Sequence, residues 1–255
     1  MDLGLRGLRA LVGGGSSGLG AAIATTLVGE GALVAISARP GDRLESRAGE
    51  FGALAVPADL STPDGPGSAV AATVAGLGGL DLLLVNSGGP PGGDFAALDE
   101  ATWGTAIDGV LLAAFRLVRA ALPHLGESPS PAILIILSSS VREPIPGLTT
   151  SNVLRPGLVG FIKSLTAEIA PIRINGIAPG RVSTDRIAHL DGLRAAATGQ
   201  SLDAIRDEMI ARIPLGRYGD PAEVGRLGAF LLSPAASYIS GAIVPIDGGL
   251  IRALP

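Results

Sequence analysis

Continuous apolar runs alternate with helix-like segments along the whole chain. The runs lack alternation of apolar and polar residues, which indicates strands buried on both faces, as in a parallel sheet. Seven strands are predicted, at Leu8–Gly13, Ala32–Ser37, Ala53–Pro57, Leu80–Asn86, Ala132–Ser138, Arg173–Ala178 and Ala242–Ile246. Helices are predicted between them, at Gly18–Glu30, Asp42–Glu50, Ser68–Leu77, Ala101–Leu122, Asn152–Ala170 and Pro221–Leu232. This order predicts a doubly wound α/β fold, with helices on both faces of a seven-stranded parallel sheet.

The domain organisation follows from the absence of a linker. No stretch rich in Pro, Gly or Ser divides the chain into two self-sufficient halves, and 47% hydrophobic residues suffice for a large core. We therefore expect one domain over residues 1–255. The polar stretch from Thr184 to Tyr218 interrupts the alternation and contains a short helical pattern at Leu202–Ile213. It follows the sixth strand, where a substrate lid is expected.

Charge and composition exclude several partners. A net charge of -4 without a basic cluster argues against binding to nucleic acid or to an anionic membrane. The apolar runs have the length of strands, so no membrane span is expected. The chain has no cysteine and its N-terminus has no apolar signal stretch. We expect a cytoplasmic protein without a metal site, acting on a small molecule.

A glycine-rich loop follows the first predicted strand. It reads Gly13-Gly14-Gly15-Ser16-Ser17-Gly18-Leu19-Gly20 and leads directly into a helix. Glycines allow the backbone to turn tightly against a diphosphate, which the free N–H groups of the helix start then bind. An ordinary strand-to-helix turn is the alternative, but this position in the chain favours a Rossmann-like dinucleotide site.

Several motifs in order resemble those of the short-chain dehydrogenase/reductase family. Gly14, Gly18 and Gly20 match its TGxxxGxG loop, with Gly13 in place of the threonine. The resemblance extends through almost the whole chain to Ser237-Tyr238-Ile239-Ser240-Gly241 and Asp247-Gly248-Gly249. It implies a cofactor site made by Gly14, Ser16, Ser17, Gly18, Leu19, Arg39, Asp59, Leu60, Asn86, Ser87, Gly88, Pro179, Gly180, Val182 and Thr184.

The end of the second predicted strand indicates which nicotinamide cofactor binds. An acidic residue there would accept hydrogen bonds from the ribose 2′-hydroxyl of NAD(H). This chain instead has Ser37-Ala38-Arg39, and no acid before Asp42. Arg39 is suited to a 2′-phosphate, although a surface arginine can also be merely solvated. The prediction is NADP(H), with NAD(H) as the alternative.

The family's catalytic Asn-Ser-Tyr-Lys set is largely replaced. When Gly160 to Leu165 is matched to the family's GLTKSL segment, Ser138 takes the place of the serine and Ser151 that of the tyrosine. Arg155 takes the place of the lysine, and Val110 that of the asparagine. A serine hydroxyl is a much poorer acid than a phenol. Arg155 stays protonated, so it can stabilise negative charge but is a poor proton donor.

Other residues are candidates for the proton donor. His189 in the predicted lid and Glu143 after the fifth strand are candidates, although either side chain can equally be an exposed surface group. Lys163 lies two helical turns beyond Arg155 and should not reach the site. For His124, Tyr218 and Tyr238 we expect structural roles. Pro156 and Gly157 predict that this helix is kinked or starts late.

Three functions remain open after this reading. The first is a divergent NADP(H)-dependent oxidoreductase of a carbonyl or alcohol, with Ser138, Ser151 and Arg155 as catalytic residues. It resembles 3-oxoacyl-acyl carrier protein reductases most. The second is a dinucleotide-binding pseudoenzyme with a sensor or partner role. The third, a dehalogenase-like enzyme, is disfavoured because those enzymes keep the tyrosine and lose the nucleotide loop. The resemblance also implies a homo-oligomer, commonly a tetramer.

Overall fold

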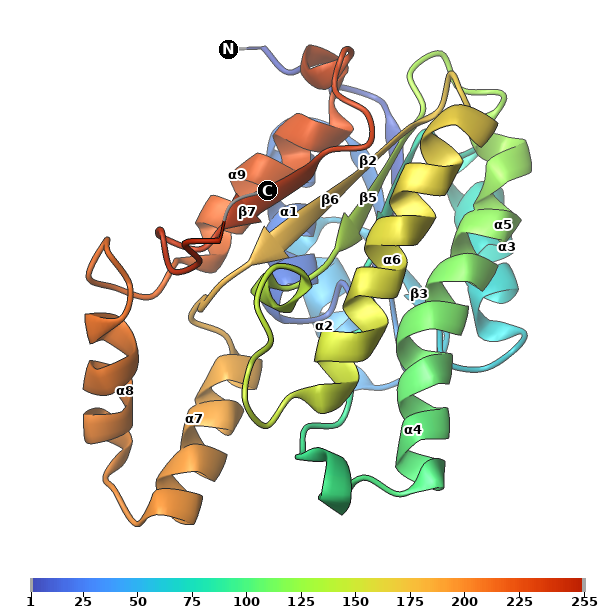
Figure 1. Cartoon of the computed structure of the whole chain (residues 1–255). Helices are drawn as coiled ribbons and strands as arrows, with labels where there is room; N and C mark the ends of the chain where they lie inside the picture. The colour runs from blue at the N-terminus through green and yellow to red at the C-terminus, as the bar shows by residue number, and fades with distance from the viewer. Residues whose placement is uncertain (1, 254–255) are drawn as a thin grey trace.

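The computed structural model describes residues 2–253, which form a single parallel sheet flanked by helices (Figure 1). The strands are β1 (Arg9–Gly13), β2 (Leu33–Ala38), β3 (Leu54–Pro57), β4 (Leu82–Val85), β5 (Ala132–Ile136), β6 (Arg173–Pro179) and β7 (Ile243–Ile246). The main helices are α1 (Gly18–Gly29), α2 (Asp42–Phe51), α3 (Gly65–Leu77), α4 (Glu100–Ile107), α5 (Ala113–Leu125), α6 (Thr149–Glu168), α7 (Asp185–Thr198), α8 (Leu202–Ala211) and α9 (Pro221–Leu232). The predicted fold class is confirmed.

The strand order places a crevice at the middle of the sheet. The order is β3-β2-β1-β4-β5-β6-β7, so the chain reverses its direction of winding between β1 and β4. Val12 of β1 lies beside Leu84 of β4, and Leu84 beside Leu134 of β5. Doubly wound sheets bind ligands at such a reversal, outside the carboxyl ends of the strands. The loops after β1, β4 and β5 therefore carry the candidate site.

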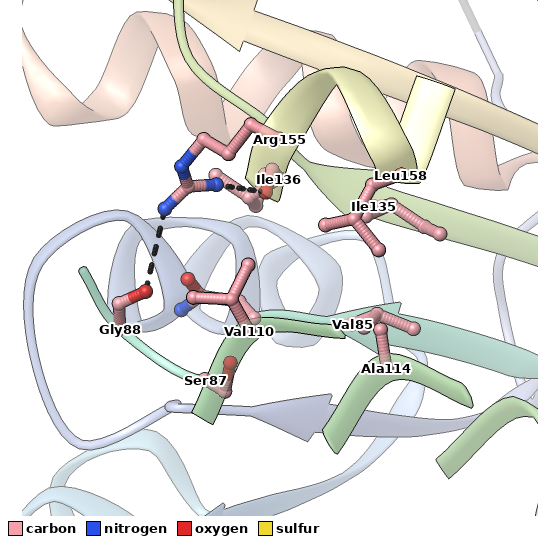
Figure 2. A pocket seen from close by; sticks show the side chains of 10 residues that line it. Val85, Ser87, Gly88, Val110, Ala114, Ile135, Ile136, Arg155 and Leu158 are labelled. Atoms are coloured by element: carbon pink, nitrogen blue, oxygen red, sulfur yellow. Dashed lines mark hydrogen bonds between the residues drawn. The ribbon is translucent and has the colours of Figure 1, made fainter. Parts of the chain in front are cut away.

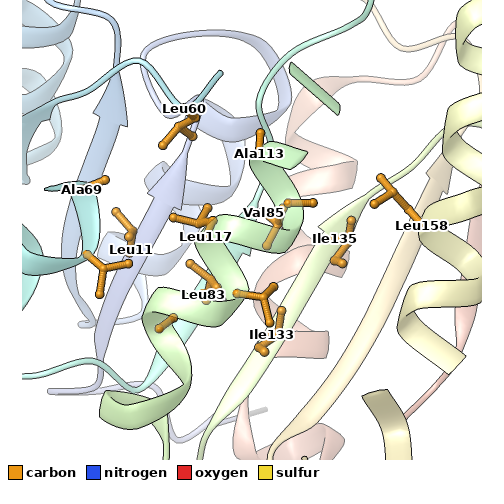
Figure 3. Packing of buried hydrophobic residues seen from close by; sticks show 14 of the residues in the cluster. Leu11, Leu60, Ala69, Leu83, Val85, Ala113, Leu117, Ile133, Ile135 and Leu158 are labelled. Atoms are coloured by element: carbon orange, nitrogen blue, oxygen red, sulfur yellow. The ribbon is translucent and has the colours of Figure 1, made fainter. Parts of the chain in front are cut away.

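Both faces of the sheet are covered, which explains why its strands are apolar without alternation. Leu11, Leu83 and Ile133 pack toward α3, α5 and α6, as Figure 3 shows. Val12 and Leu134 belong to a second core on the opposite face, with α1 and α9. Burial of apolar area on both faces is the main stabilising contribution to this fold.

The helix predicted at Ala101–Leu122 is interrupted. A π-helical turn, η2 (Asp108–Leu112), separates α4 from α5. Such turns insert one extra residue per turn and often occur at functional sites. Val110, at the centre of this turn, is buried and points toward the carboxyl end of the sheet.

Of the two alternatives predicted for α6, a kink or a late start, the late start is wrong. The helix begins at Thr149 and continues through Pro156 without interruption. The Asn152 side chain fixes its first turn, since Asn152 Oδ1 accepts from Ile145 N at 3.0 Å and its Nδ2 donates to Ile145 O at 2.9 Å. Buried Leu154 and Leu158 add packing against the core. These contacts offset the hydrogen bond that the proline cannot make.

The segment predicted as a lid contains two helices, of which only α8 was expected. Helix α7 is absent from the prediction because its sequence has no apolar stripe. A small core of Ile205, Met209, Ile213 and Tyr218 lies beneath it. Within residues 2–253, no helix combines the length and the hydropathy required to cross a membrane.

Candidate active site

The glycine-rich loop between β1 and α1 has a backbone shape that favours glycine. Gly14 and Gly18 have φ angles of +59° and +55°. A Cβ on Gly14 would lie 2.7 Å from Asn86 Nδ2, and one on Gly20 would lie 2.3 Å from the Gly14 carbonyl oxygen. Asn86 Nδ2 donates to the Gly13 carbonyl oxygen at 3.3 Å. The loop is therefore packed too closely against the end of β4 to accept side chains.

This loop directs the start of α1 toward the crevice. Ser17 is the N-cap residue, but its side chain makes no capping hydrogen bond, and the first turn of the helix carries no acid. Free N–H groups and the positive end of the helix dipole favour a bound anion. Ser16 and Leu19 are half-buried beside them. The residues present fit the diphosphate of a dinucleotide.

Arg39 and Asp59 form the rim of the crevice beyond β2 and β3. Arg39 is exposed and follows directly after β2. Asp59 Oδ1 accepts from Ser61 Oγ at 2.7 Å and from Ser61 N at 2.9 Å. These hydrogen bonds, with a contribution from the charge of Arg39, lower the pKa of Asp59. Leu60 is buried behind it. A guanidinium thus occupies the place where an acid would select NAD(H).

The residues after β6 form the opposite wall of the crevice. Pro179 ends β6, and a Cβ on Gly180 would lie 2.6 Å from Asp247 Cβ, so the turn after it requires a small residue. Val182 is buried. Thr184 caps α7, its Oγ1 accepting from Ile187 N at 3.4 Å. These four residues of the predicted cofactor site thus lie between the sheet and α7.

Three serines meet near the end of β5. Ser138 Oγ accepts from Ser140 N at 3.1 Å and caps a short 3-10 helix, η3 (Ser139–Val141). Ser140 Oγ and Ser151 Oγ lie 3.1 Å apart, and either can donate. Both of these side chains are buried. Ser140 is not among the site residues expected from the sequence. The run of three serines after β5 was a signal, but selecting one of them requires the backbone direction.

Arg155 lies one turn after Ser151 on α6 and connects two strand ends (Figure 2). Its Nη1 donates to Ile136 O at 2.6 Å and its Nη2 to Gly88 O at 3.3 Å. Burial, with a smaller contribution from the charge of Arg186, lowers the pKa of Arg155 to about 10. At neutral pH the guanidinium therefore remains protonated.

A small cavity of about 10 Å³ adjoins Arg155, enough for about one water molecule. Ser87, Gly88, Val110 and Ile136 contribute to its wall, as Figure 2 shows. Ser87 Oγ also donates to the Gly109 carbonyl oxygen, which fixes the loop after β4 against the π-helical turn. Val110, predicted to stand in the place of the family's asparagine, gives this wall an apolar side chain where η2 contributes to it.

The other proton-donor candidates are exposed or are engaged elsewhere. Glu143 and Lys163 are exposed, and His189 is exposed on α7. Tyr218 donates to Asp191 Oδ2 at 3.0 Å, and its burial together with this hydrogen bond raises its pKa to about 12. The structural role predicted for Tyr218 fits this contact. Tyr238 is fully exposed, at 104% relative exposure, so packing in the core of the chain is excluded for it.

Comparison with known proteins agrees with this geometry. A family model described as Enoyl-(Acyl carrier protein) reductase matches residues 14–251. Nodulation protein G of Rhizobium sp. (strain N33) is 33% identical over 250 residues, covering 96% of this chain and 98% of the relative. The 3-oxoacyl-acyl-carrier-protein reductase FabG of Chlamydia muridarum (strain MoPn / Nigg) is 30% identical over 250 residues, covering 94% and 96%.

A solved structure resembles the whole chain. L-sorbose reductase from Gluconobacter frateurii, in complex with NADPH and L-sorbose, is 29% identical with a TM-score of 0.92, and the match covers 100% of both chains. The chain belongs to the short-chain dehydrogenase/reductase family of oxidoreductases. The predicted membership, and the resemblance to 3-oxoacyl-acyl carrier protein reductases, are confirmed.

The close approach of Gly20 to Gly14 generates a prediction for cofactor binding. In Gly20→Ala, the new methyl group must displace the Gly14 carbonyl from its place in the loop. We expect the NADPH dissociation constant to rise about tenfold or more, as fluorescence titration measures it. Gly29→Ala, at the other end of α1, is the control because its Cβ meets nothing within 4 Å. Equal NADPH affinity in both variants would contradict the tight loop.

Proposed function

We propose that this protein is an NADP(H)-dependent oxidoreductase of a carbonyl or alcohol substrate that works without a catalytic phenol. The observation that carries the proposal is the buried Ser140–Ser151 hydroxyl pair, one helical turn from the Arg155 guanidinium, at the same edge of the sheet as the glycine-rich loop. NADP(H) as the cofactor is supported by the exposed Arg39 after β2 and by the NADPH complex of the sorbose reductase.

When bound, NADPH supplies a hydride to a carbonyl carbon, and the carbonyl oxygen takes up a proton to complete the alcohol. The residues of the chain have to orient that oxygen and move the proton. Ser138 orients the substrate oxygen from the end of β5. Ser151 Oγ donates the proton and recovers one through Ser140 Oγ, 3.1 Å away, with water as the final source.

Arg155 acts through its charge. A guanidinium that remains protonated stabilises the negative charge that develops on the substrate oxygen, and burial strengthens this effect. Its two hydrogen bonds to main-chain carbonyls hold it in place before substrate arrives, so little reorganisation is needed. Proton supply thus rests on the hydroxyls and charge stabilisation on the arginine, whereas the family's tyrosine and lysine work as one unit.

A pseudoenzyme with a sensor or partner role is the second candidate. It is favoured by the occupants of the catalytic positions, since Ser151, Arg155 and Val110 retain neither the phenol nor the amine nor the amide of the family pattern. The dehalogenase-like alternative is disfavoured by the intact glycine loop. For both the oxidoreductase and the pseudoenzyme we propose a homo-oligomer, which is commonly a tetramer in this family. Val153 on α6 is among the exposed apolar side chains that such an assembly could cover.

The position of Arg39 generates a prediction on cofactor choice. Arg39→Met removes a guanidinium that can pair with the 2′-phosphate, so the NADPH dissociation constant should rise about tenfold or more. The dissociation constant for NADH should stay within about twofold, because NADH has no such phosphate. Arg47→Met on α2, where Arg47 pairs with Glu50 at 2.7 Å, is the control. Loss of affinity for both cofactors in Arg39→Met would contradict the assignment.

Turnover separates the two candidate functions. NADPH oxidation is followed against a panel of aldehydes, ketones and imines, with cofactor affinity measured in parallel by calorimetry. We expect turnover with at least one carbonyl class. Tight NADPH binding with no oxidation across the panel would establish the pseudoenzyme instead.

On an active substrate, Ser151→Ala should lower kcat about 10²-fold, because it removes the proposed proton donor. The NADPH dissociation constant should be unchanged. Ser164→Ala, at an exposed position further along α6, is the matched control and should keep full kcat. An unchanged kcat in Ser151→Ala would remove Ser151 from the mechanism.

A further inference from the structure

Two arginines at the crevice have no acidic partner. Arg155 is buried and Arg186, in the first turn of α7, is half-buried. None of the ion pairs formed among residues 2–253 includes either guanidinium. The acid next to Arg186 in sequence, Asp185, pairs instead with Arg43 at 2.8 Å. Buried charges are normally paired, so this pair of cations requires an explanation.

Arg186 reaches from the lid helix to the loop after β4. Its Nη2 donates to Pro90 O at 2.7 Å. A Cβ on Gly89 would lie 3.0 Å from Arg186 Nε, so the guanidinium lies directly against this loop. Arg155 binds Gly88 O, two residues earlier in the same loop. The two guanidiniums therefore approach one loop from two different helices, α6 and α7, and the charge of Arg186 is close enough to influence Arg155.

The lowered pKa values of both arginines also indicate that these positive charges lack a partner. Burial and then the charge of Arg186 lower the pKa of Arg155 to about 10, and burial lowers the pKa of Arg186. Both positive charges are thus held at a cost in free energy that a nearby anion would offset. Each guanidinium has five N–H donors, and the hydrogen bonds described use two on Arg155 and one on Arg186. Donors remain for a ligand.

Arg173 shows how this fold satisfies a buried arginine that has no ligand to bind. Its guanidinium donates to the carbonyls of Leu231, Leu232 and Ser233 at 2.8, 3.1 and 2.9 Å. Those carbonyls end α9, where the helix dipole is negative and favours a cation. Arg155 has two carbonyls, one of them at 3.3 Å, and a second cation nearby. The Arg155–Arg186 pair therefore differs from a structural arginine.

We propose that Arg155 and Arg186 form a binding site for a carboxylate of the substrate, which is accordingly an oxo acid or the corresponding hydroxy acid. Arg186 makes the direct contact, since the planar fork of a guanidinium matches the two oxygens of a carboxylate. The more deeply buried Arg155 adds its positive charge. The inference rests on the proposed function for the identity of the reacting group. Because Arg155 is one helical turn from Ser151, the carboxylate lies a few bonds from the carbonyl. The other source of an anion is the cofactor diphosphate, which the test must distinguish.

The first measurement compares matched substrates. Pyruvate, acetoacetate and levulinate are each compared with their methyl ester as oxidants of NADPH. The acid that fits best should have a kcat/KM about tenfold or more above its ester, and Arg186→Met should abolish this preference by raising KM for the acid with little change in kcat. Arg226→Met, at an exposed position on α9, is the control. An equal effect of Arg186→Met on acid and ester would overturn the proposal.

The second measurement does not depend on turnover. Each of the three oxo acids is titrated into the NADP⁺-loaded protein by calorimetry, a combination in which both reactants are oxidised. Wild-type protein should bind at least one of them, and Arg186→Met should bind it about tenfold more weakly. Binding without turnover would refute the proposed oxidoreductase and support the anion site. No binding by any oxo acid would overturn the inference. An NADPH affinity about tenfold weaker in Arg186→Met, with acid binding intact, would assign Arg186 to the cofactor and would also overturn it.

Discussion

The parallel register of β1, β4 and β5, buried on both faces, is the constraint on which the site depends. It brings three carboxyl ends to one edge, so the loops that follow must pack against each other there. Gly14 and Gly20 meet Asn86 at distances that exclude side chains, and Arg155 joins the ends of the next two strands through main-chain carbonyls. Sheet geometry thus fixes the position of the glycine-rich loop relative to α6.

The replacements on α6 change how charge and protons are handled. A lysine beside a phenol can lower the phenol's pKa and exchange a proton with it. Arg155, even with its pKa lowered to about 10, is a permanent cation at neutral pH. Its planar fork also reaches two carbonyls at once, which anchors it in a way that a lysine's single ammonium does not. In the proposed mechanism, proton movement therefore falls to the serine hydroxyls, and we expect their weak acidity to limit the rate.

Most of the fold could be predicted because strands buried on both faces leave a clear apolar signal. The predicted strands all exist, with ends shifted by only one or two residues. Helix α7 was missed because its side chains show no apolar stripe. Its local signals were confined to its ends, with a capping threonine at position 184, an acid at position 185 and Gly199 after its last residue. The late start predicted for α6 failed because tertiary contacts of Asn152 and Leu154 outweigh the local effect of Pro156. The positions of Ser140 and Arg186 in the site depend on the direction in which the backbone turns after a strand. The periodicity of apolar residues gives no information on that direction.

The same geometry connects α7, in the segment predicted as a lid, to the proposed catalytic residues. Arg186 belongs to α7, and its hydrogen bond to Pro90 O bridges the lid helix and the loop after β4. Asp191, near the middle of α7, accepts from Arg181 at 2.6 Å and from Tyr218 at 3.0 Å, so this helix is anchored at a second point. An anion bound between Arg186 and Arg155 would reduce the electrostatic repulsion between their two guanidiniums. Substrate charge would thereby stabilise the arrangement in which Ser151 and the lid enclose the reacting carbonyl.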